Sequence, residues 1–239
     1  VDAYNGTVDF YLADPRDPVI QAYSRIYPGL FKGLDRMPAE LQGHIRYPKD
    51  IFDIQMHIFT KYHQTDPEVF FKQDDIWEFP TISSNGKSSR IEPNYMTLNI
   101  LDKEKDEFIL LTSMIPKART NLRSMIVAGC DRPNYGKIVV FSFPRGTLVY
   151  GPQQVDAFIN QDTAISRDFT LWNQSGSRVN RGKMIIQPIG EAIVYIQPVY
   201  LEATEGVRIP QLKRLILSKG GTVVMEPSLE QGLEALNER

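Results

Sequence analysis

Two adjacent carboxylates beside a tryptophan form the pattern in this sequence that comes closest to an enzyme site. Asp74 and Asp75 stand just before Trp77. Glycan hydrolases need a pair of carboxylates around the scissile bond, and an aromatic face can stack on a sugar ring. The same residues also suit a plainer role, in which the acids cap a helix and the tryptophan closes a helical layer. The spatial separation of the carboxylates decides between the two interpretations.

The three histidines, His44, His57 and His63, lie at intervals that make no local metal-binding pair. His57 shares the polar face of a predicted helix with Asp53, which is four residues earlier and can hold a protonated imidazole. His63 falls in the last turn of that helix, where the helix dipole favours a cation. We therefore expect structural or surface roles for all three histidines and predict no metal ligand.

Cys130 is the only cysteine, so an intrachain disulfide cannot form. It follows the apolar segment Met125–Ala128, and Arg132 is close by in the sequence. A catalytic thiol needs a cation or helix start that lowers its pKa and a partner base, and no histidine can be placed near it from the sequence. Cys130 is therefore predicted to be a buried core residue without a chemical role.

A basic cluster, Lys117, Arg119 and Arg123, surrounds Thr120–Leu122. Such a cluster can grip an anionic headgroup or polymer. Its alternative interpretation is a solvated loop that leads into the start of a helix. Both interpretations stay open at the level of the sequence.

The composition is that of an ordinary globular protein and excludes several classes. The 239 residues carry a formal charge of −2, with 42% hydrophobic and 23% charged residues, which is enough for a sizeable core and rules out collagen, coiled coil and wholesale disorder. A near-zero charge without a basic block argues against nucleic-acid binding. No phosphate-binding, dinucleotide-binding, nucleophile-elbow or zinc-protease motif is present. We therefore predict no catalytic, cofactor-binding or metal-binding residue and no cofactor, and the lack of a catalytic motif favours a non-enzymatic protein without deciding whether it is an enzyme.

The elements that would position these side chains begin with a helical region. A strand is expected over 7–12, and helices are expected to start at Asp17-Pro18, Pro38, Pro48 and Asp66-Pro67. The helix from Pro48 should run to about His63. The segment Thr81–Arg90 is polar and contains Asn85-Gly86, so it is predicted to be a mobile loop.

Strands dominate the rest of the chain. They are predicted over 95–101, 107–114, 137–143, 184–189, 192–201, 212–217 and 222–225. Helices are expected from Pro152, from Asp162 and after Pro227. Because turns rather than crossover helices join most strands, we predict an α+β fold, in which a helical N-terminal layer packs on a mostly antiparallel sheet. The domain prediction is one unit over 1–239, with the helical layer in 1–80 and a mainly β part, with inserted helices, in 94–239.

Several stretches in order along the chain resemble the C-terminal region of uncharacterised protein family 0182. They are Val1–Val8, Leu41–Gln55 (LQGHIRYPKDIFDIQ), Tyr62–Pro67, Asn134–Lys137, Gly151–Val155, Ile165-Ser166, Leu171-Trp172 and Ile196–Leu201. The members of that family are large bacterial membrane proteins with several N-terminal transmembrane helices and a large extracytoplasmic part. None of the motifs is a catalytic signature, so the resemblance implies no site residue.

The resemblance implies a location. The chain would be an extracytoplasmic segment, periplasmic or extracellular, of a protein anchored in the cell membrane by the parent's N-terminal helices. Its start at Val1, without a signal-peptide pattern, and the lack of any apolar run long enough to span a bilayer agree with such a segment.

The leading hypothesis is a non-enzymatic domain that binds or scaffolds envelope components or partner subunits. The alternative is an envelope-polymer hydrolase that uses paired carboxylates. A deep cleft with two facing carboxylates would favour the hydrolase, and a flat or filled surface would favour the binding domain.

Overall fold

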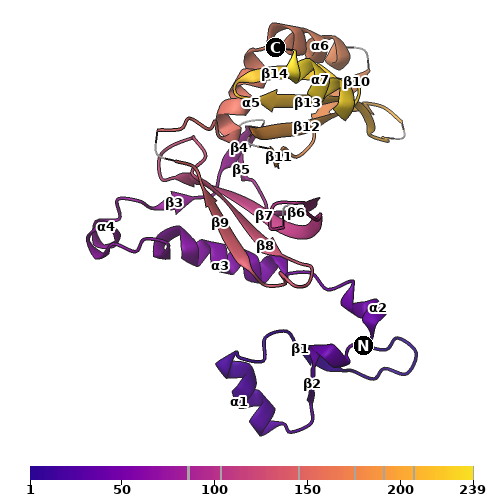
Figure 1. The fold of residues 1–239 in the computed structure, drawn as a ribbon. Helices are drawn as coiled ribbons and strands as arrows, with labels where there is room; N and C mark the ends of the chain where they lie inside the picture. The colour runs from indigo at the N-terminus through magenta and orange to yellow at the C-terminus, as the bar shows by residue number, and fades with distance from the viewer. Residues whose placement is uncertain are drawn as a thin grey trace. The chain divides into compact units, whose positions relative to one another are not determined.

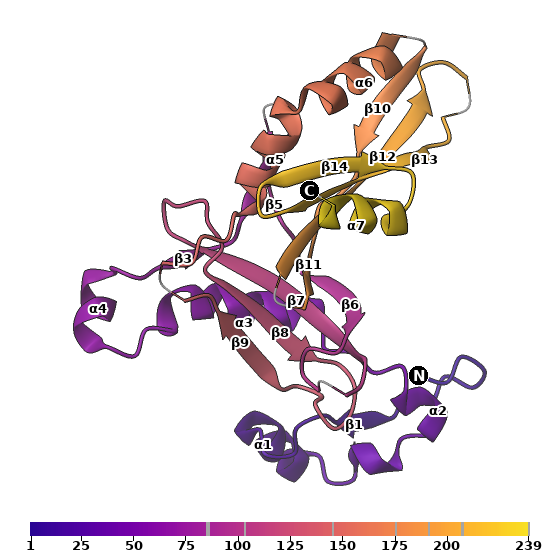
Figure 2. The same ribbon diagram turned by 45° about the horizontal axis from the view of Figure 1, so that its top comes forward.

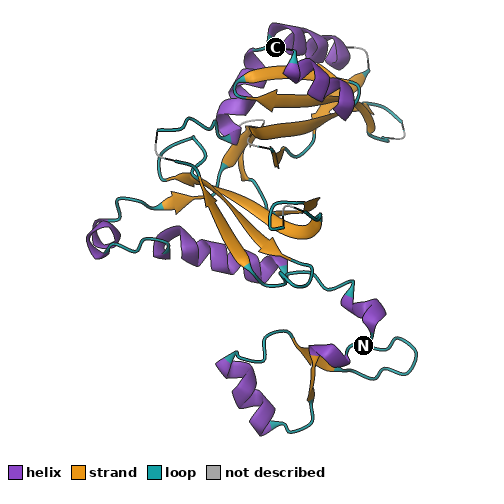
Figure 3. Ribbon diagram, viewed as in Figure 1, coloured by secondary structure: helices purple, strands orange, loops and turns teal. Residues whose placement is uncertain are grey.

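The fold is known from a computed structural model, which describes residues 1–84, 87–102, 104–144, 146–174, 176–190, 192–206 and 208–238. The contacts of the chain divide it into two compact parts, Val1–Arg46 and Tyr47–Arg239. Helices and strands occur in both parts (Figure 1, Figure 3). The chain has the predicted α+β fold.

The first part contains two short strands, one helix of nine residues and two single helical turns. Strand β1 (Phe10–Leu12) pairs in parallel with β2 (Phe31–Gly33), and helix α1 (Pro18–Ile26) lies between them in the sequence. The 3-10 turn Leu34–Arg36 and the short helix α2 (Ala39–Gln42) follow. Asp17 caps α1 as predicted, because its carboxylate accepts from two backbone amides of the first turn.

The second part begins with two helices and a five-stranded sheet. Helices α3 (Lys49–Tyr62) and α4 (Pro67–Lys72) precede the sheet strands β3 (Trp77–Glu78), β6 (Asn94–Leu98), β7 (Glu107–Pro116), β8 (Ser124–Gly129) and β9 (Ile138–Ser142). The order β3-β7-β8-β9, with β6 also on β7, is antiparallel throughout. Helix α3 buries Phe52 and Met56 against one face of this sheet, which is the predicted packing of a helix on a sheet.

Strand β7 is covered on both faces, which explains its nearly unbroken apolar sequence. Leu110 and Met114 face α3, whereas Ile109 and Leu111 face the opposite core. Strand β8 alternates in the same way. These two strands are therefore the centre of the fold, with helix α3 on one side and the C-terminal elements on the other.

A second five-stranded antiparallel sheet follows helices α5 (Pro152–Gln161) and α6 (Thr163–Gln174). Its strands are β10 (Ser177–Arg181), β11 (Ile185–Ile189), β12 (Ala192–Ala203), β13 (Gln211–Lys219) and β14 (Thr222–Glu226), in the order β10-β12-β13-β14 with β11 also on β12. Helix α7 (Leu229–Asn237) packs on β13 and β14 (Figure 2). One core joins this sheet and α5 to the first sheet, through Val155, Tyr195 and Ile109 among others.

The prediction of a mobile loop over Thr81–Arg90 is wrong. Residues 81–84 and 87–90 form strands β4 (Thr81–Ser84) and β5 (Lys87–Arg90), which pair as an antiparallel hairpin, while Asn85-Gly86 lies outside the described residues. Ile82 packs on the core that joins the two sheets, and Arg90 forms an ion pair with Asp53 of α3. These two attachments hold a segment that has almost no apolar residue.

Most other predicted elements are present with small shifts of their ends. Within residues 47–239, strand structure begins at Trp77 rather than near residue 94, because β3 and the β4–β5 hairpin precede β6. The sequence prediction also omitted β2, β8 and β10 as strands. The prediction that residues 1–239 form a single unit stays a prediction; the contacts group residues 1–46 and 47–239 separately.

Candidate functional site

A cleft of about 640 Å³ lies within residues 47–239, between the hairpin β4–β5 and the second sheet. Its volume falls in the range of small-molecule sites. Ten of the fourteen described residues that line it are polar or charged. The lining residues are Ile82, Ser83, Ser89, Arg90, Ile91, Glu92, Asn94, Asp156, Asn160, Arg181, Gly182, Lys183, Met184 and Gln197.

One wall of the cleft is a hydrogen-bonded network centred on Arg181 of β10. Its guanidinium donates to Asp156 of α5 at 2.5 Å, to Asn160 of α5 at 2.8 Å and to Gln197 of β12 at 2.6 and 3.0 Å. The second oxygen of Asp156 accepts from Asn160 at 3.0 Å, and Gln197 donates to the carbonyl of Gly182 at 3.0 Å. The network therefore ties helix α5 to strands β10 and β12 through several hydrogen bonds.

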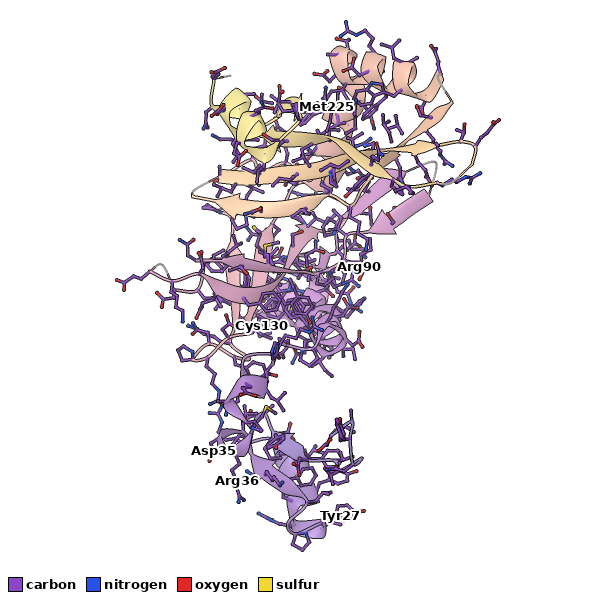
Figure 4. All side chains as sticks on the ribbon, turned by 90° about the vertical axis from the view of Figure 1, so that its right-hand side faces the viewer. Tyr27, Asp35, Arg36, Arg90, Cys130 and Met225 are labelled. Carbon is purple, nitrogen blue, oxygen red and sulfur yellow. The ribbon has the colours of Figure 1, made fainter. Side chains whose placement is uncertain are left out.

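The opposite wall is organised around Arg90 of β5, which Figure 4 labels. Both terminal nitrogens of its guanidinium donate to the carboxylate of Asp53 on α3. The guanidinium also lies over the ring of Phe79, 3.4 Å from the ring centre, a favourable cation–π arrangement. Asp53 and Phe79 thus fix a side chain that the sequence alone places in a loop.

The charges of the cleft largely cancel one another. Arg181 pairs with Asp156 and Arg90 with Asp53, and Glu92 pairs with Lys49 of α3 at 3.2 Å. Lys183 contributes one further positive charge and is exposed. The lining therefore offers hydrogen-bonding groups with a single excess cation among its described residues, which suits a polar ligand better than a strongly charged one.

The predicted carboxylate pair beside Trp77 is not part of this cleft. Trp77 is buried and its ring stacks on His63 with 3.8 Å between ring centres, while its indole N–H donates to Asp75 at 3.3 Å. The indole face is covered by the histidine and is not presented to a sugar. The buried Trp77 agrees with the plainer interpretation. The helix-capping role expected for the acids is not seen, because Asp66 and Gln73 cap α4 and Asp75 accepts from the indole instead.

The histidines lie in three different settings. His44 is exposed in the first part of the chain. His57 is exposed on α3, with Nδ1 3.6 Å from the carboxylate of Asp53, as the spacing predicts, although that carboxylate is mainly engaged by Arg90. His63 is partly buried, and its side chain, 7% exposed, stacks on Trp77. No group of three or more metal-binding side chains occurs among the residues that the structure describes.

Cys130 is buried, as predicted, in the core beneath α3 and away from the cleft (Figure 4). The backbone amide of Tyr47 donates to its sulfur at 3.4 Å. Of the two interpretations of the basic cluster Lys117, Arg119 and Arg123, the solvated loop that leads into a helix agrees with the structure in its solvated part only. Lys117 and Arg119 are exposed, but the segment leads into strand β8, and Arg123 donates to the carbonyl of Phe143 at 2.7 Å.

Sequence reasoning missed every residue of the cleft. Arg90 and Asp156 are 66 positions apart in the sequence, and Arg181 follows 25 positions after Asp156. The sequence contains a hint of the cleft at one point only, because an Asn-Gly pair such as Asn85-Gly86 is typical of a two-residue hairpin turn. The segment Thr81–Arg90 is nevertheless predicted to be a loop, because it lacks the apolar alternation of a strand.

The fold and the cleft define the class of protein: an α+β segment with a rigid polar cleft and no helix among its described residues that is long and apolar enough to cross a membrane. The model of the uncharacterised protein family UPF0182 matches residues 1–172. The chain belongs to this family, as its motifs indicate. No solved structure matches it.

Curated relatives match the chain from end to end. It is similar to a UPF0182 protein of Syntrophobacter fumaroxidans, at 54% identity over 100% of this chain and 27% of the relative. A UPF0182 protein of Nitrosococcus oceani is 52% identical over 100% of this chain and 27% of the relative. A UPF0182 protein of a Synechococcus species is 48% identical over 99% of this chain and 28% of the relative. The chain thus spans about a quarter of the relatives that it matches.

Proposed function

We propose that this segment is a non-enzymatic binding and scaffolding part of a larger family protein, and that it takes a small polar ligand in the cleft. The observation that carries the proposal is a cleft of about 640 Å³ whose walls are fixed by internal ion pairs. Fixed walls lower the entropic cost of ligand binding, because few side chains must be ordered on association. The relatives, about four times as long, support its role as part of a larger assembly.

The proposed ligand is rich in hydroxyl groups and carries an acidic group. Amide, guanidinium and serine side chains line the cleft, and Lys183 supplies the excess positive charge. A fragment of an envelope glycan, such as a disaccharide muropeptide, has this chemistry. We place the segment periplasmic or extracellular in a membrane-anchored parent, a proposal that rests on the family resemblance alone.

Titration calorimetry with a disaccharide muropeptide tests the binding proposal. Lys183→Ala should weaken binding about tenfold, because a hydrogen bond to a charged group contributes about 1.5 kcal/mol or more. Lys213→Ala, which removes an exposed lysine of β13 outside the cleft, is the matched control. Ser89→Trp should abolish binding by filling the cleft, whereas Ser142→Trp on the exposed edge of β9 should not. Equal affinity in all four variants would refute the assignment of the cleft.

The hydrolase alternative has one observation in its favour, since Glu92 and Asp156 both line a cleft. Both oxygens of Asp156 are occupied, by Arg181 and by Asn160, and Glu92 is paired with Lys49. These contacts give the carboxylates a structural use and favour binding over hydrolysis. Release of new reducing ends from the titrated glycan, lost in Glu92→Gln, would reverse that preference.

The location is tested in the full-length parent with a reporter fused after this segment. We expect activity only for a reporter that functions outside the cytoplasm. Activity of a cytoplasmic reporter at the same position would overturn the proposed location and leave the cleft unaffected.

A further inference from the structure

Helix α3 has a second apolar face that nothing in residues 47–239 covers among the described side chains. Ile51, Ile54, Ile58 and Tyr62 are 49%, 59%, 55% and 68% exposed. Their spacing of three, four and four residues places them in one stripe along the helix. The opposite face of α3 already buries its own apolar residues against the sheet, so this stripe is additional to the core.

The stripe continues onto helix α4. The ring of Tyr62 contacts that of Phe70 with 5.5 Å between ring centres, and the neighbouring Phe71 is 88% exposed. Charged side chains border the stripe, including Asp50 near its start and Lys61 near its end. An exposed apolar patch with a polar rim marks an interaction surface.

The size of the patch argues against a second copy of the chain as the occupant. The 14 residues of α3 span about 21 Å, and a stripe one helix diameter wide is about 10 Å across. The stripe therefore covers about 200 Å² on α3, and a few hundred Å² when the exposed side chains of α4 are included. A stable contact between separate molecules needs roughly 800 Å² on each partner. A segment of the same polypeptide needs much less, because covalent linkage gives it an effective concentration in the millimolar range.

We propose that an amphipathic helix from the part of the family polypeptide outside these 239 residues packs along α3 and onto α4. The curated relatives have about three quarters of their length outside this segment, which is ample length to supply such a helix in cis. The three-and-four spacing of the stripe fits a helix that crosses α3 at a shallow angle of about 20°. The apolar side chains of the incoming helix would cover Ile54 and Ile58 at the centre.

A photo-crosslinking residue at the position of Ile54 in a full-length relative, such as the Syntrophobacter fumaroxidans protein, tests the proposal. We expect an intramolecular crosslink to a peptide outside the region that matches residues 1–239, identified by mass spectrometry. The same crosslinker at the position of Leu171, an exposed leucine of helix α6, is the control and should give several-fold less product. Crosslinks to the region of 1–46, or between two copies, would overturn the proposal.

Paired substitutions provide a second readout. The variant that combines Ile54→Lys and Ile58→Lys should leave the unfolding temperature of the 239-residue chain unchanged, since both side chains are exposed there. In the full-length relative, the equivalent substitutions should lower the unfolding temperature by a few degrees, because they place charged side chains in the apolar contact between α3 and the proposed helix. Unchanged unfolding temperatures in both proteins would contradict the proposal.

Discussion

The Arg181 network offers the sharpest test of how the cleft is built. Arg181→Met removes the donor to Asp156, Asn160 and Gln197 at once and keeps an unbranched side chain of similar reach. The carboxylate of Asp156 is only 10% exposed and would lose its cation. Breaking a buried ion pair from one side costs about 3–5 kcal/mol, because the remaining charge is uncompensated.

The expected loss lies near the lower end of that range. Arg181 is itself 22% exposed, so water can replace part of its hydrogen bonding. Asn160 also still donates to the second oxygen of Asp156. We therefore expect the free energy of unfolding to fall by about 3 kcal/mol. For a part of the size of residues 47–239, this corresponds to a drop of about 6–12 °C in the unfolding temperature.

Urea denaturation followed by tryptophan fluorescence and circular dichroism measures this loss. Arg178→Met, at an exposed position of the same strand β10, is the matched control and should change stability by about 0.5 kcal/mol or less. The double variant Arg181→Met with Asp156→Leu should be more stable than Arg181→Met alone, because no unpaired carboxylate remains. A loss below about 1 kcal/mol for Arg181→Met, or a double variant no better than the single one, would refute a structural role for the pair.

Three further outcomes follow from buried groups elsewhere. Cys130 should react slowly with iodoacetamide until urea unfolds the chain, and rapid labelling of the native protein would contradict its burial. Cys130→Ala should lower the free energy of unfolding by about 2 kcal/mol. Cys130→Ser should lower it less, because the serine oxygen can still accept the hydrogen bond that the amide of Tyr47 donates to the sulfur. Burial raises the pKa of the Tyr195 hydroxyl, which donates to the carbonyl of Tyr150, above the ordinary value of 10.0. The native state therefore keeps a proton that the unfolded chain loses above about pH 10, so the free energy of unfolding should fall as the pH rises further, and less steeply in Tyr195→Phe; equal alkaline slopes in denaturation curves would exclude this cause. Gly151→Ala should lower the free energy of unfolding in urea by about 3 kcal/mol, because the added Cβ would lie 1.7 Å from the backbone carbonyl oxygen of Thr120. A variant as stable as the wild type would show that the backbone can move enough to accept the Cβ.

Helix starts were predictable because they depend on neighbouring residues. Asp17 and Asp66 each accept hydrogen bonds from backbone amides of the following turn, and Asp162 accepts from the amide of Ile165 at 2.9 Å. Pro48 and Pro152 begin or precede helices at the expected positions. All the information that these boundaries need lies within four residues of the chain.

The cleft was not predictable because its parts are distant in the sequence and carry no local pattern. Asp53 and Arg90 are 37 positions apart, and each taken alone is an ordinary charged residue. Trp77 shows the opposite case, in which adjacent residues offer an apparent site pattern but the ring is part of the core, as the plainer of the two interpretations requires. Periodicity reports which face of an element is buried, but it does not report which distant side chains meet on the polar face.

The hairpin β4–β5 shows how local sequence and distant contacts both contribute to the cleft. Its sequence lacks the apolar alternation that stabilises a strand locally, and the hairpin is instead held by Ile82 in the core and by the pair of Arg90 with Asp53. Replacing Ser83 and Ser89 with valine would favour the strands but would remove two hydroxyl groups from the cleft wall. A polar segment that is rigid through distant contacts meets the needs of a polar ligand, since its hydrogen-bonding groups are held in place before binding. The conflict between local sequence and observed structure in this hairpin agrees with the proposal that the cleft binds a polar ligand, since such conflicts are expected at functional sites.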